Sequence, residues 1–355
     1  VVDQQWDQFT GRAALNWTPK LDFTDQTLVY GSYAHGYKAG GANPPGAAFT
    51  AITGTIVSQP GYDSGEVGVP VHPLTFKPEF VDAFELGTKN TLFDGALTLN
   101  ASAFYYNYEN YQISQIVDRT SINLNFDAHA KGMELEAMWE PVPGLRFNFA
   151  GGWEDTSIAH GERAVDLMDR TAGHAGWIVV KPFATQASNC ILPEYVVAAI
   201  ITQQQISSVG DESPTNPTFA CTQAYGAHID PLTQLPYKED PTVHATSYYL
   251  IPPGYHGFDP LSVDPNAPAG VNNGLGLPPN NGEGFSKDLG GNELPNAPPY
   301  TISAGAQYTM PLSSDWAGTL RADYYWQDYS WARVFNDNPY DRLRGYTNVN
   351  LALIL

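Results

Sequence analysis

Long segments of the chain alternate between apolar and polar residues with a period of two. Residues 97–103 run Leu, Thr, Leu, Asn, Ala, Ser, Ala. From Leu145 to Trp153 the odd positions are Leu, Phe, Phe, Gly and Trp, while the even positions from Arg146 to Glu154 include both charges. Successive side chains of a β-strand point to opposite faces, so this pattern predicts strands with one apolar and one polar face.

The segment from Trp316 to Gln327 shows the same pattern and fixes which face is which. Its apolar set includes Leu320 and Tyr324, whereas Arg321 and Asp323 fall on the opposite face. A register flip by one residue would turn both charges to the apolar side, and an arginine at the middle of a bilayer costs roughly 2–4 kcal/mol. We therefore expect the charged set to point away from lipid.

Similar segments recur along the chain and predict an all-β fold. Strands in soluble domains cluster near ~5–6 residues, whereas a tilted membrane strand needs ~9–11. The predicted strands are of the longer kind, which favours a transmembrane antiparallel β-barrel. The nine predicted strands are residues 7–18, 27–40, 78–90, 96–112, 125–140, 145–154, 298–311, 316–327 and 345–355.

The connections between these strands alternate between short and long, as expected when one rim of a barrel faces the cell exterior. Short turns are predicted at residues 19–26, 91–95, 141–144 and 312–315, and we expect them to be periplasmic. Long extracellular loops are predicted at residues 41–77, 113–124, 159–297 and 335–344.

The 159–297 segment is the longest connection and contains more than half of the 28 prolines. We expect it to form an extracellular cap with little buried core, not an independent domain. Residues 193–201 are predicted to form a short helix there. Cys190 and Cys221 are the two cysteines of the chain, and their place in this segment suits a loop-stapling disulfide, with two free thiols as the alternative.

Composition narrows the function classes. Aromatic residues make up 13% of the chain and charged residues only 15%, which is little charge for a surface that faces water on all sides. The net charge of −20, with 17 Lys and Arg, argues against nucleic acid as a partner. No apolar run reaches the ~18 residues that a transmembrane helix needs, which leaves strands as the only means of crossing.

No catalytic constellation has the required spacing. The chain lacks a Gly-x-Ser-x-Gly, a His-Glu-x-x-His, a Cys-x-x-Cys and a phosphate-binding glycine loop. The histidines are scattered, and Asp259, Asp264 and Asn272 alternate with Pro and Gly in a way that indicates turns more simply than calcium ligands. We predict no enzyme, no cofactor and no metal site.

Several segments, in the same order along the chain, resemble TonB-dependent receptors of the outer membrane. They cover essentially every strand and almost none of the long loops. The most specific segment contains Glu85, Leu86 and Gly87, for which alternation predicts Leu86 toward lipid and Glu85 toward the lumen. The matching segments are residues 9–19, 30–41, 76–90, 97–111, 130–136, 296–301 and 345–350.

The resemblance implies that residues 1–355 form an incomplete part of a larger barrel of roughly 22 strands with a plugged lumen, because nine strands do not close such a barrel. It further implies a plug domain and a TonB-grasped segment before Val1, and a final strand after Leu355. The expected location is the outer membrane of a Gram-negative cell.

The function that the resemblance implies is active import of a scarce nutrient such as a siderophore or a carbohydrate. The implied partners are outer-membrane lipid and lipopolysaccharide, the TonB complex acting through the plug region, and a small-molecule nutrient. A surface lipoprotein held by the long loop is a separate hypothesis. Two other functions stay open, a passive porin-like channel and a structural or adhesive surface barrel.

Candidate site residues fall into two groups. Charges predicted to face the lumen or a plug are Arg12, Glu85, Lys89, Glu134, Glu136, Arg146, Arg321 and Asp323. Aromatic residues near the outer strand ends either form an interfacial girdle on the lipid side or stack on a ligand from the lumen side. The predicted ligand contacts are Tyr111, Tyr329, Trp331 and Arg333.

Overall fold

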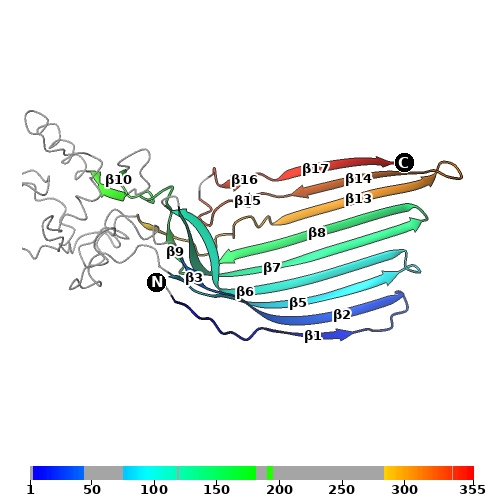
Figure 1. The fold of residues 1–355 in the computed structure, drawn as a ribbon, viewed down its shortest axis with the longest axis horizontal. Helices are drawn as coiled ribbons and strands as arrows, with labels where there is room; N and C mark the ends of the chain where they lie inside the picture. Colours follow the sequence, from blue (N-terminus) through cyan, green and yellow to red (C-terminus); the bar gives the residue numbers. More distant parts are fainter. Residues whose placement is uncertain (1–2, 44–74, 118–119, 181–189, 195–283, 338) are drawn as a thin grey trace, which may run out of the picture.

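A computed structural model describes residues 3–43, 75–117, 120–180, 190–194, 284–337 and 339–355. Nine long strands form one antiparallel sheet in the order β1-β2-β5-β6-β7-β8-β13-β14-β17 (Figure 1). Each strand pairs with the long strand that precedes or follows it in the chain. The strands are β1 (Gly11–Trp17), β2 (Gln26–Lys38), β5 (Glu79–Leu92), β6 (Leu97–Val117), β7 (Thr120–Val142), β8 (Leu145–Ile158), β13 (Tyr300–Pro311), β14 (Ala317–Gln327) and β17 (Tyr346–Ile354).

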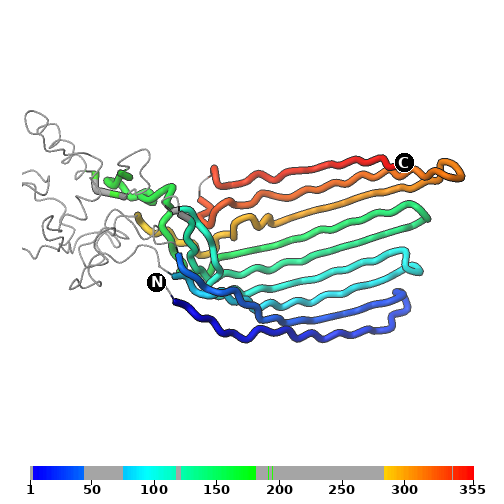
Figure 2. The backbone as a smooth tube through the Cα atoms, in the orientation of Figure 1, coloured from blue at the N-terminus to red at the C-terminus, as the bar shows by residue number. Residues whose placement is uncertain are grey.

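All nine predicted strands are present, and the connections lie alternately at the two ends of the sheet, but one of the predicted long loops is absent. The backbone trace shows four short turns at one end of the sheet and the longer segments at the other (Figure 2). We call these the short-turn end and the long-loop end. The first predicted strand is too long, because β1 begins at Gly11 and not at Asp7.

The expectation of a long loop at residues 113–124 is wrong. Strands β6 and β7 continue through it as a hairpin, with Val117 opposite Thr120. A bulge lies between Tyr108 and Tyr111, where Asn110 has a φ of 55°. The bulge puts Tyr111 on the same face as Tyr108, and both rings pack against a buried cluster described below.

The sheet has two chemically different faces. Large side chains such as Leu86, Leu320 and Leu351 are more than half exposed on the first face, which we call the apolar face. Glu85 and Arg321 lie on the opposite face, which we call the polar face. A sheet in water would bury such an apolar surface, so its exposure over many strands is typical of contact with lipid.

Short strands at the long-loop end join the connecting segments in pairs. The pairs are β3 (Gly41–Ala42) with β4 (Thr75–Phe76), β9 (Arg163–Val165) with β12 (Ser286–Asp288), β10 (Trp177–Val180) with β11 (Cys190–Pro193), and β15 (Ser330–Trp331) with β16 (Arg342–Leu343). No helix among the described residues is long and apolar enough to cross a membrane.

Contrary to expectation, the 159–297 segment does contribute to a buried core at its described ends. Ala164, Leu289 and Leu294 are almost fully buried. Together with residues of β7, β8 and the segment after β14 they form one cluster, which we call the loop core. Its members are Phe126, Ala128, Ile158, Ala164, Leu289, Leu294, Val334 and Phe335.

Two other predictions for this segment stay untested. Cys190 opens β11 opposite Val180, but Cys221 lies outside the described residues, so the disulfide remains a prediction. The expected helix at residues 193–201 also lies outside them, apart from its first two positions.

Candidate functional site

Strand register places all eight predicted lumen charges on the polar face. One row of directly opposed residues runs from Ser32 through Glu85, Phe104 and Gly132 to Glu154. The other charges occupy parallel rows reached by steps of two residues along each strand. Sharing this face are Arg12, Glu85, Lys89, Glu134, Glu136, Arg146, Arg321 and Asp323.

Some of these charges already have partners within the wall. Arg321 donates to both carboxylate oxygens of Asp323, from Nε at 2.7 Å and from Nη2 at 2.8 Å. The Tyr30 hydroxyl donates to Glu85, and the Lys89 ammonium lies 5.9 Å from the centre of the Tyr30 ring. Both interactions fix side-chain directions along the wall, and the exposed Arg321–Asp323 pair adds little stability.

Glycines on the polar face make room for aromatic rings from neighbouring strands. A Cβ at Gly132 would lie 2.3 Å from the Trp153 carbonyl oxygen and 2.6 Å from the Phe104 ring. A Cβ at Gly87 would lie 2.6 Å from the Tyr30 ring. Each ring therefore lies over a glycine of the next strand, at a distance that leaves no room for a larger side chain there.

At the long-loop end, the connecting segments fold over the polar face. Ala128 and Ile158 are opposed across β7 and β8 on that face, and both belong to the loop core with Leu289 and Val334. The Leu294 amide donates to the buried Thr156 hydroxyl at 3.0 Å, which attaches the 284–297 segment to β8. The loop core thus covers this end of the polar face.

A set of ion pairs holds the covering segments to one another. The Asp166 side chain is 1% exposed and accepts from Nη1 of Arg333 at 2.5 Å. Arg333 also donates from Nε to Asp341 at 2.9 Å. These contacts join the segment after β8 to the segment between β14 and β17.

Lys287, on β12, adds a third segment to the same set. Its ammonium lies 2.5 Å from Asp337, 2.8 Å from Asp169 and 3.4 Å from Asp166. We call this set the loop ion network. Its members are Asp166, Asp169, Lys287, Arg333, Asp337 and Asp341.

The network shifts the ionisation of its members. Burial alone raises the pKa of Asp166, but hydrogen bonds from Arg333 and the Met168 amide, with the charge of Lys287, bring the pKa below its ordinary value. Burial lowers the pKa of Lys287, and the carboxylates of Asp169 and Asp337 outweigh this and raise it. Asp166 and Lys287 are therefore each held in the charged form by their partners.

The predicted ligand residues are divided between two places. Tyr329 and Trp331 lie edge to face, with ring centres 6.4 Å apart. The Arg342 guanidinium stands 4.1 Å from the centre of the Tyr329 ring, and the Tyr329 hydroxyl donates to Glu293 at 2.9 Å. Tyr111 instead packs on Tyr108, 5.1 Å between ring centres.

Arg333 lies near Trp331 in the chain, but its nitrogens are bound by Asp166 and Asp341. Neither carboxylate, nor Lys287, was singled out from the sequence. Asp166 and Arg333 are 167 residues apart, and no spacing signal joins residues so distant. Within the described parts of the chain, no group of three or more His, Cys, Asp or Glu is placed to hold a metal ion.

Comparison with known proteins identifies the architecture. A family model described as "TonB dependent receptor-like, beta-barrel" matches residues 1–179, half of the chain. The chain belongs to the TonB-dependent receptor-like β-barrel family. The resemblance read from the strand segments is therefore confirmed, and the fold is part of a transmembrane β-barrel of the outer membrane.

Solved structures of receptors and transporters also match, at low identity. The chain is similar to the ferric yersiniabactin uptake receptor FyuA from Yersinia pestis, with 15% identity, a TM-score of 0.45, and coverage of 98% of this chain and 29% of that one. The ferric preacinetobactin receptor BauA from Acinetobacter baumannii matches with 12% identity, a TM-score of 0.41, and coverage of 96% and 28%. The chain thus spans less than a third of these proteins. A search of curated proteins finds no match.

Family membership shows what each face of the sheet contacts. The apolar face contacts lipid, the polar face lines the lumen, and the long-loop end is extracellular. Tyr105 and Tyr324 point to the lipid face, as the girdle interpretation expects, whereas Tyr106 and Tyr108 lie on the lumen face. The family consists of receptors, and absence of catalysis in this chain stays a prediction.

Proposed function

We propose that this chain forms part of the wall and of the extracellular mouth of a receptor that imports a scarce nutrient by TonB-coupled active transport. The observation that carries the proposal is the loop core, which covers the outer end of the lumen face with folded, buried segments. A passive pore needs a continuous water path past its mouth. A mouth covered by packed loops suits a protein that first captures a ligand and then admits it by an energy-driven step.

The capture site in this proposal contains Tyr329 and Trp331. Their edge-to-face rings, together with the Arg342 guanidinium, offer flat apolar surface next to a cation. This combination suits a small molecule with a planar or sugar ring and an anionic group, such as a siderophore or a carbohydrate. Tyr111, which packs on Tyr108 at another place on the lumen face, would contact the ligand as part of a second aromatic surface.

Arg333 enters the proposal in a more restricted role. Because Asp166 and Asp341 bind its guanidinium, an anionic ligand would have to displace a carboxylate to reach it. We infer that Arg333 mainly positions the segment that carries Trp331. The eight lumen charges would contact a plug domain or line the water path in the same protein.

The partners follow from this reading. TonB would act through a plug region of the same protein, lipopolysaccharide would surround the apolar face, and a surface lipoprotein would contact the 159–297 segment. The alternatives are a passive porin-like channel and a structural or adhesive barrel. Uptake that does not depend on TonB favours the first, and absence of any uptake favours the second.

The experiment is an uptake assay on whole cells that express the full-length protein. The probes are a radiolabelled ferric catecholate, a radiolabelled ferric hydroxamate and a labelled maltodextrin, each measured with and without TonB. We expect uptake of one probe that requires TonB and falls at least tenfold in Trp331→Ala. The matched control is Trp316→Ala, because Trp316 lies exposed at the short-turn end.

Two results would contradict the proposal. Uptake that is equal with and without TonB would point to a passive channel. Equal loss in Trp331→Ala and Trp316→Ala would show that the aromatic pair at the mouth has no special part in capture.

A further inference from the structure

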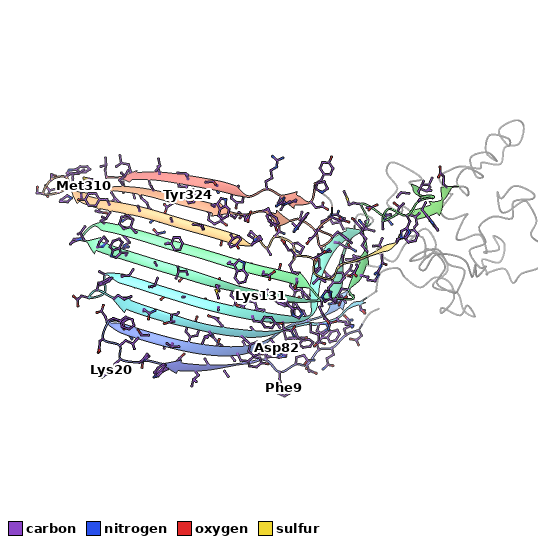
Figure 3. All side chains as sticks on the ribbon, turned by 180° about the vertical axis from the view of Figure 1, so that it is seen from behind. Phe9, Lys20, Asp82, Lys131, Met310 and Tyr324 are labelled. Atoms are coloured by element: carbon purple, nitrogen blue, oxygen red, sulfur yellow. The ribbon has the colours of Figure 1, made fainter. Side chains whose placement is uncertain are left out.

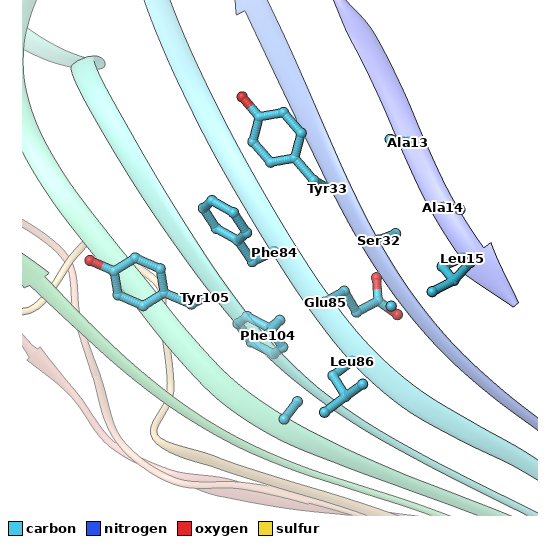
Figure 4. Close-up of a pocket in the computed structure, with 12 residues that line it drawn as sticks. Ala13, Ala14, Leu15, Ser32, Tyr33, Phe84, Glu85, Leu86, Phe104 and Tyr105 are labelled. Atoms are coloured by element: carbon cyan, nitrogen blue, oxygen red, sulfur yellow. The ribbon is translucent and has the colours of Figure 1, made fainter. Parts of the chain in front are cut away.

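The apolar face carries a groove at its outer part, between β1, β2, β5 and β6. The groove has a volume of about 740 Å³. Two rows of opposed residues on the apolar face line it (Figure 4). The deeper row is Leu15, Gly31, Leu86 and Ala103, and the row nearer the long-loop end is Ala13, Tyr33, Phe84 and Tyr105. The row between them, whose side chains belong to the polar face, also borders the groove and consists of Ala14, Ser32, Glu85 and Phe104.

The shape of the groove follows from the sizes of these side chains. Gly31 and Ala103 alternate with Leu15 and Leu86 in the deeper row, so small residues leave space between large ones. In the outer row, the Tyr33 and Phe84 rings lie 5.1 Å apart and form one aromatic side of the groove. A hydrocarbon chain fits this surface, because nearly all of its lining is apolar.

A polar row lies directly beyond the aromatic row, on the same face. Asp82 accepts from the Tyr33 hydroxyl at 2.7 Å and is bonded to His35 Nδ1 at 2.8 Å. Both bonds go to Oδ1, and within the described residues no hydrogen bond reaches Oδ2. The Tyr105 hydroxyl lies 3.3 Å from His129 Nδ1. Asp82 is 39% exposed, so Oδ2 is open to an outside donor.

A second charged pair stands beside this row. Lys131 lies 3.0 Å from Asp155, and both side chains are about half exposed. Asp82 and Lys131 are in the half of the sheet nearer the long-loop end, whereas Lys20 and Met310 are at the short-turn end (Figure 3). The polar groups therefore lie toward the extracellular end of the lipid face, on the side of the outer-leaflet headgroups.

The charge of these polar groups restricts the headgroup. Asp82 and Asp155 carry two negative charges, and Lys131 carries the one permanent positive charge, already paired with Asp155. A phosphate placed here would meet an open carboxylate and no unpaired lysine. A sugar avoids this conflict, because its hydroxyl groups donate to carboxylates, accept from imidazole N–H groups and stack on the rings of Tyr33 and Tyr105.

We propose that this groove binds an outer-leaflet glycolipid, with an acyl chain between Leu86 and Phe84 and an uncharged sugar headgroup held by Asp82, His35 and His129. The site is on the lipid face and is independent of nutrient capture at the mouth. Its occupant would be a lipid that stays bound to the wall while the surrounding lipids exchange.

The test uses the full-length protein in nanodiscs of phosphatidylcholine. Diglucosyl diacylglycerol, phosphatidylglycerol and phosphorylated lipid A are added in separate samples, and native mass spectrometry measures the fraction of protein that retains each lipid. We expect the diglucosyl lipid to be retained at least tenfold more strongly than phosphatidylglycerol.

Three variants locate the site. Asp82→Ala removes the sugar acceptor, and Ala103→Leu fills the groove while leaving the polar row intact. Each is expected to lower retention of the glycolipid about tenfold. Ala304→Leu is the matched control, because Ala304 is on the same face but outside the groove, between Phe149 and Tyr324, and we expect no change.

Several outcomes would overturn the proposal. Equal retention of phosphatidylglycerol and the glycolipid would show that the groove does not recognise sugar. Stronger retention of phosphorylated lipid A would show that phosphate is the recognised group. An unchanged Ala103→Leu variant that still migrates as a folded barrel would remove the groove from the argument.

Discussion

The loop ion network leads to a specific prediction about how the mouth is held closed. Replacing Asp166 with Asn keeps the size of the side chain and removes its charge. Arg333 and Lys287 would each lose one carboxylate, but Asp341, Asp169 and Asp337 would still pair with them. The expected loss of stability is therefore smaller than the ~3–5 kcal/mol found when a buried charge is left without any partner.

The contacts of Asp166 give the magnitude. Its carboxylate accepts from Arg333 at 2.5 Å and from the Met168 amide at 2.9 Å, with almost no exposure to solvent. A hydrogen bond to a charged group is worth roughly 1.5–3 kcal/mol. Since about 1.4 kcal/mol is a factor of ten in an equilibrium constant, opening of the mouth segments should become roughly ten- to a hundredfold more frequent.

Hydrogen exchange of backbone amides in the full-length protein measures this opening. Suitable reporters are the Phe285 amide, bonded to Arg170, and the Ala332 amide, bonded to Asp341. Amides of β13 and β14 should not change, because they are held by the barrel sheet. The control variant is Asp315→Asn, at an exposed turn of the short-turn end. If the reporters exchange equally fast in Asp166→Asn and in the unaltered protein, the network does not hold the mouth closed.

Three further predictions follow from charge and packing. The folded pKa of Asp166 is below its ordinary value, so its stabilisation is complete above the ordinary value and is lost as pH falls through the folded pKa. The protection factors of the mouth amides, which correct exchange for its intrinsic pH dependence, should therefore hold to about pH 4 and fall below it. Leu351→Arg should lower the free energy of unfolding in lipid by about 2–4 kcal/mol, whereas Asn350→Arg, on the lumen face, should lower it by less than about 1 kcal/mol. Urea unfolding measures both, and equal losses of stability would contradict the face assignment. Gly132→Ala should cost about 1–3 kcal/mol in the same assay because its Cβ meets the Trp153 carbonyl, while Gly11→Ala, with open space around it, should be neutral within about 0.5 kcal/mol.

The strands and their faces were predictable because both depend on local sequence. Alternation at Leu97–Ala103 and around Arg321 requires only that neighbouring side chains point to opposite sides and that charges avoid lipid. The same rule placed Glu85 and Leu86 on opposite faces, as the register shows. The short turns followed because each strand pairs with its neighbour in the chain.

The hairpin of β6 and β7 shows where local pattern was insufficient. Alternation alone did not predict strands at residues 113–117 and 120–124, which pair at the long-loop end of the sheet. Their strand structure depends on Ile113 and Leu124 packing against the loop core. Four members of that core, Leu289, Leu294, Val334 and Phe335, come from segments more than 150 residues later in the sequence.

The sequence by itself determined the number of long strands, their order, which side of each faces lipid, and the family. Only the tertiary structure decided that the mouth segments fold onto the lumen face and that Asp166 joins Arg333 and Lys287 there. The physical reason is the distance along the chain over which each interaction acts. The membrane selects the face of each residue locally, whereas a buried ion pair depends on which distant segments meet once the sheet has formed.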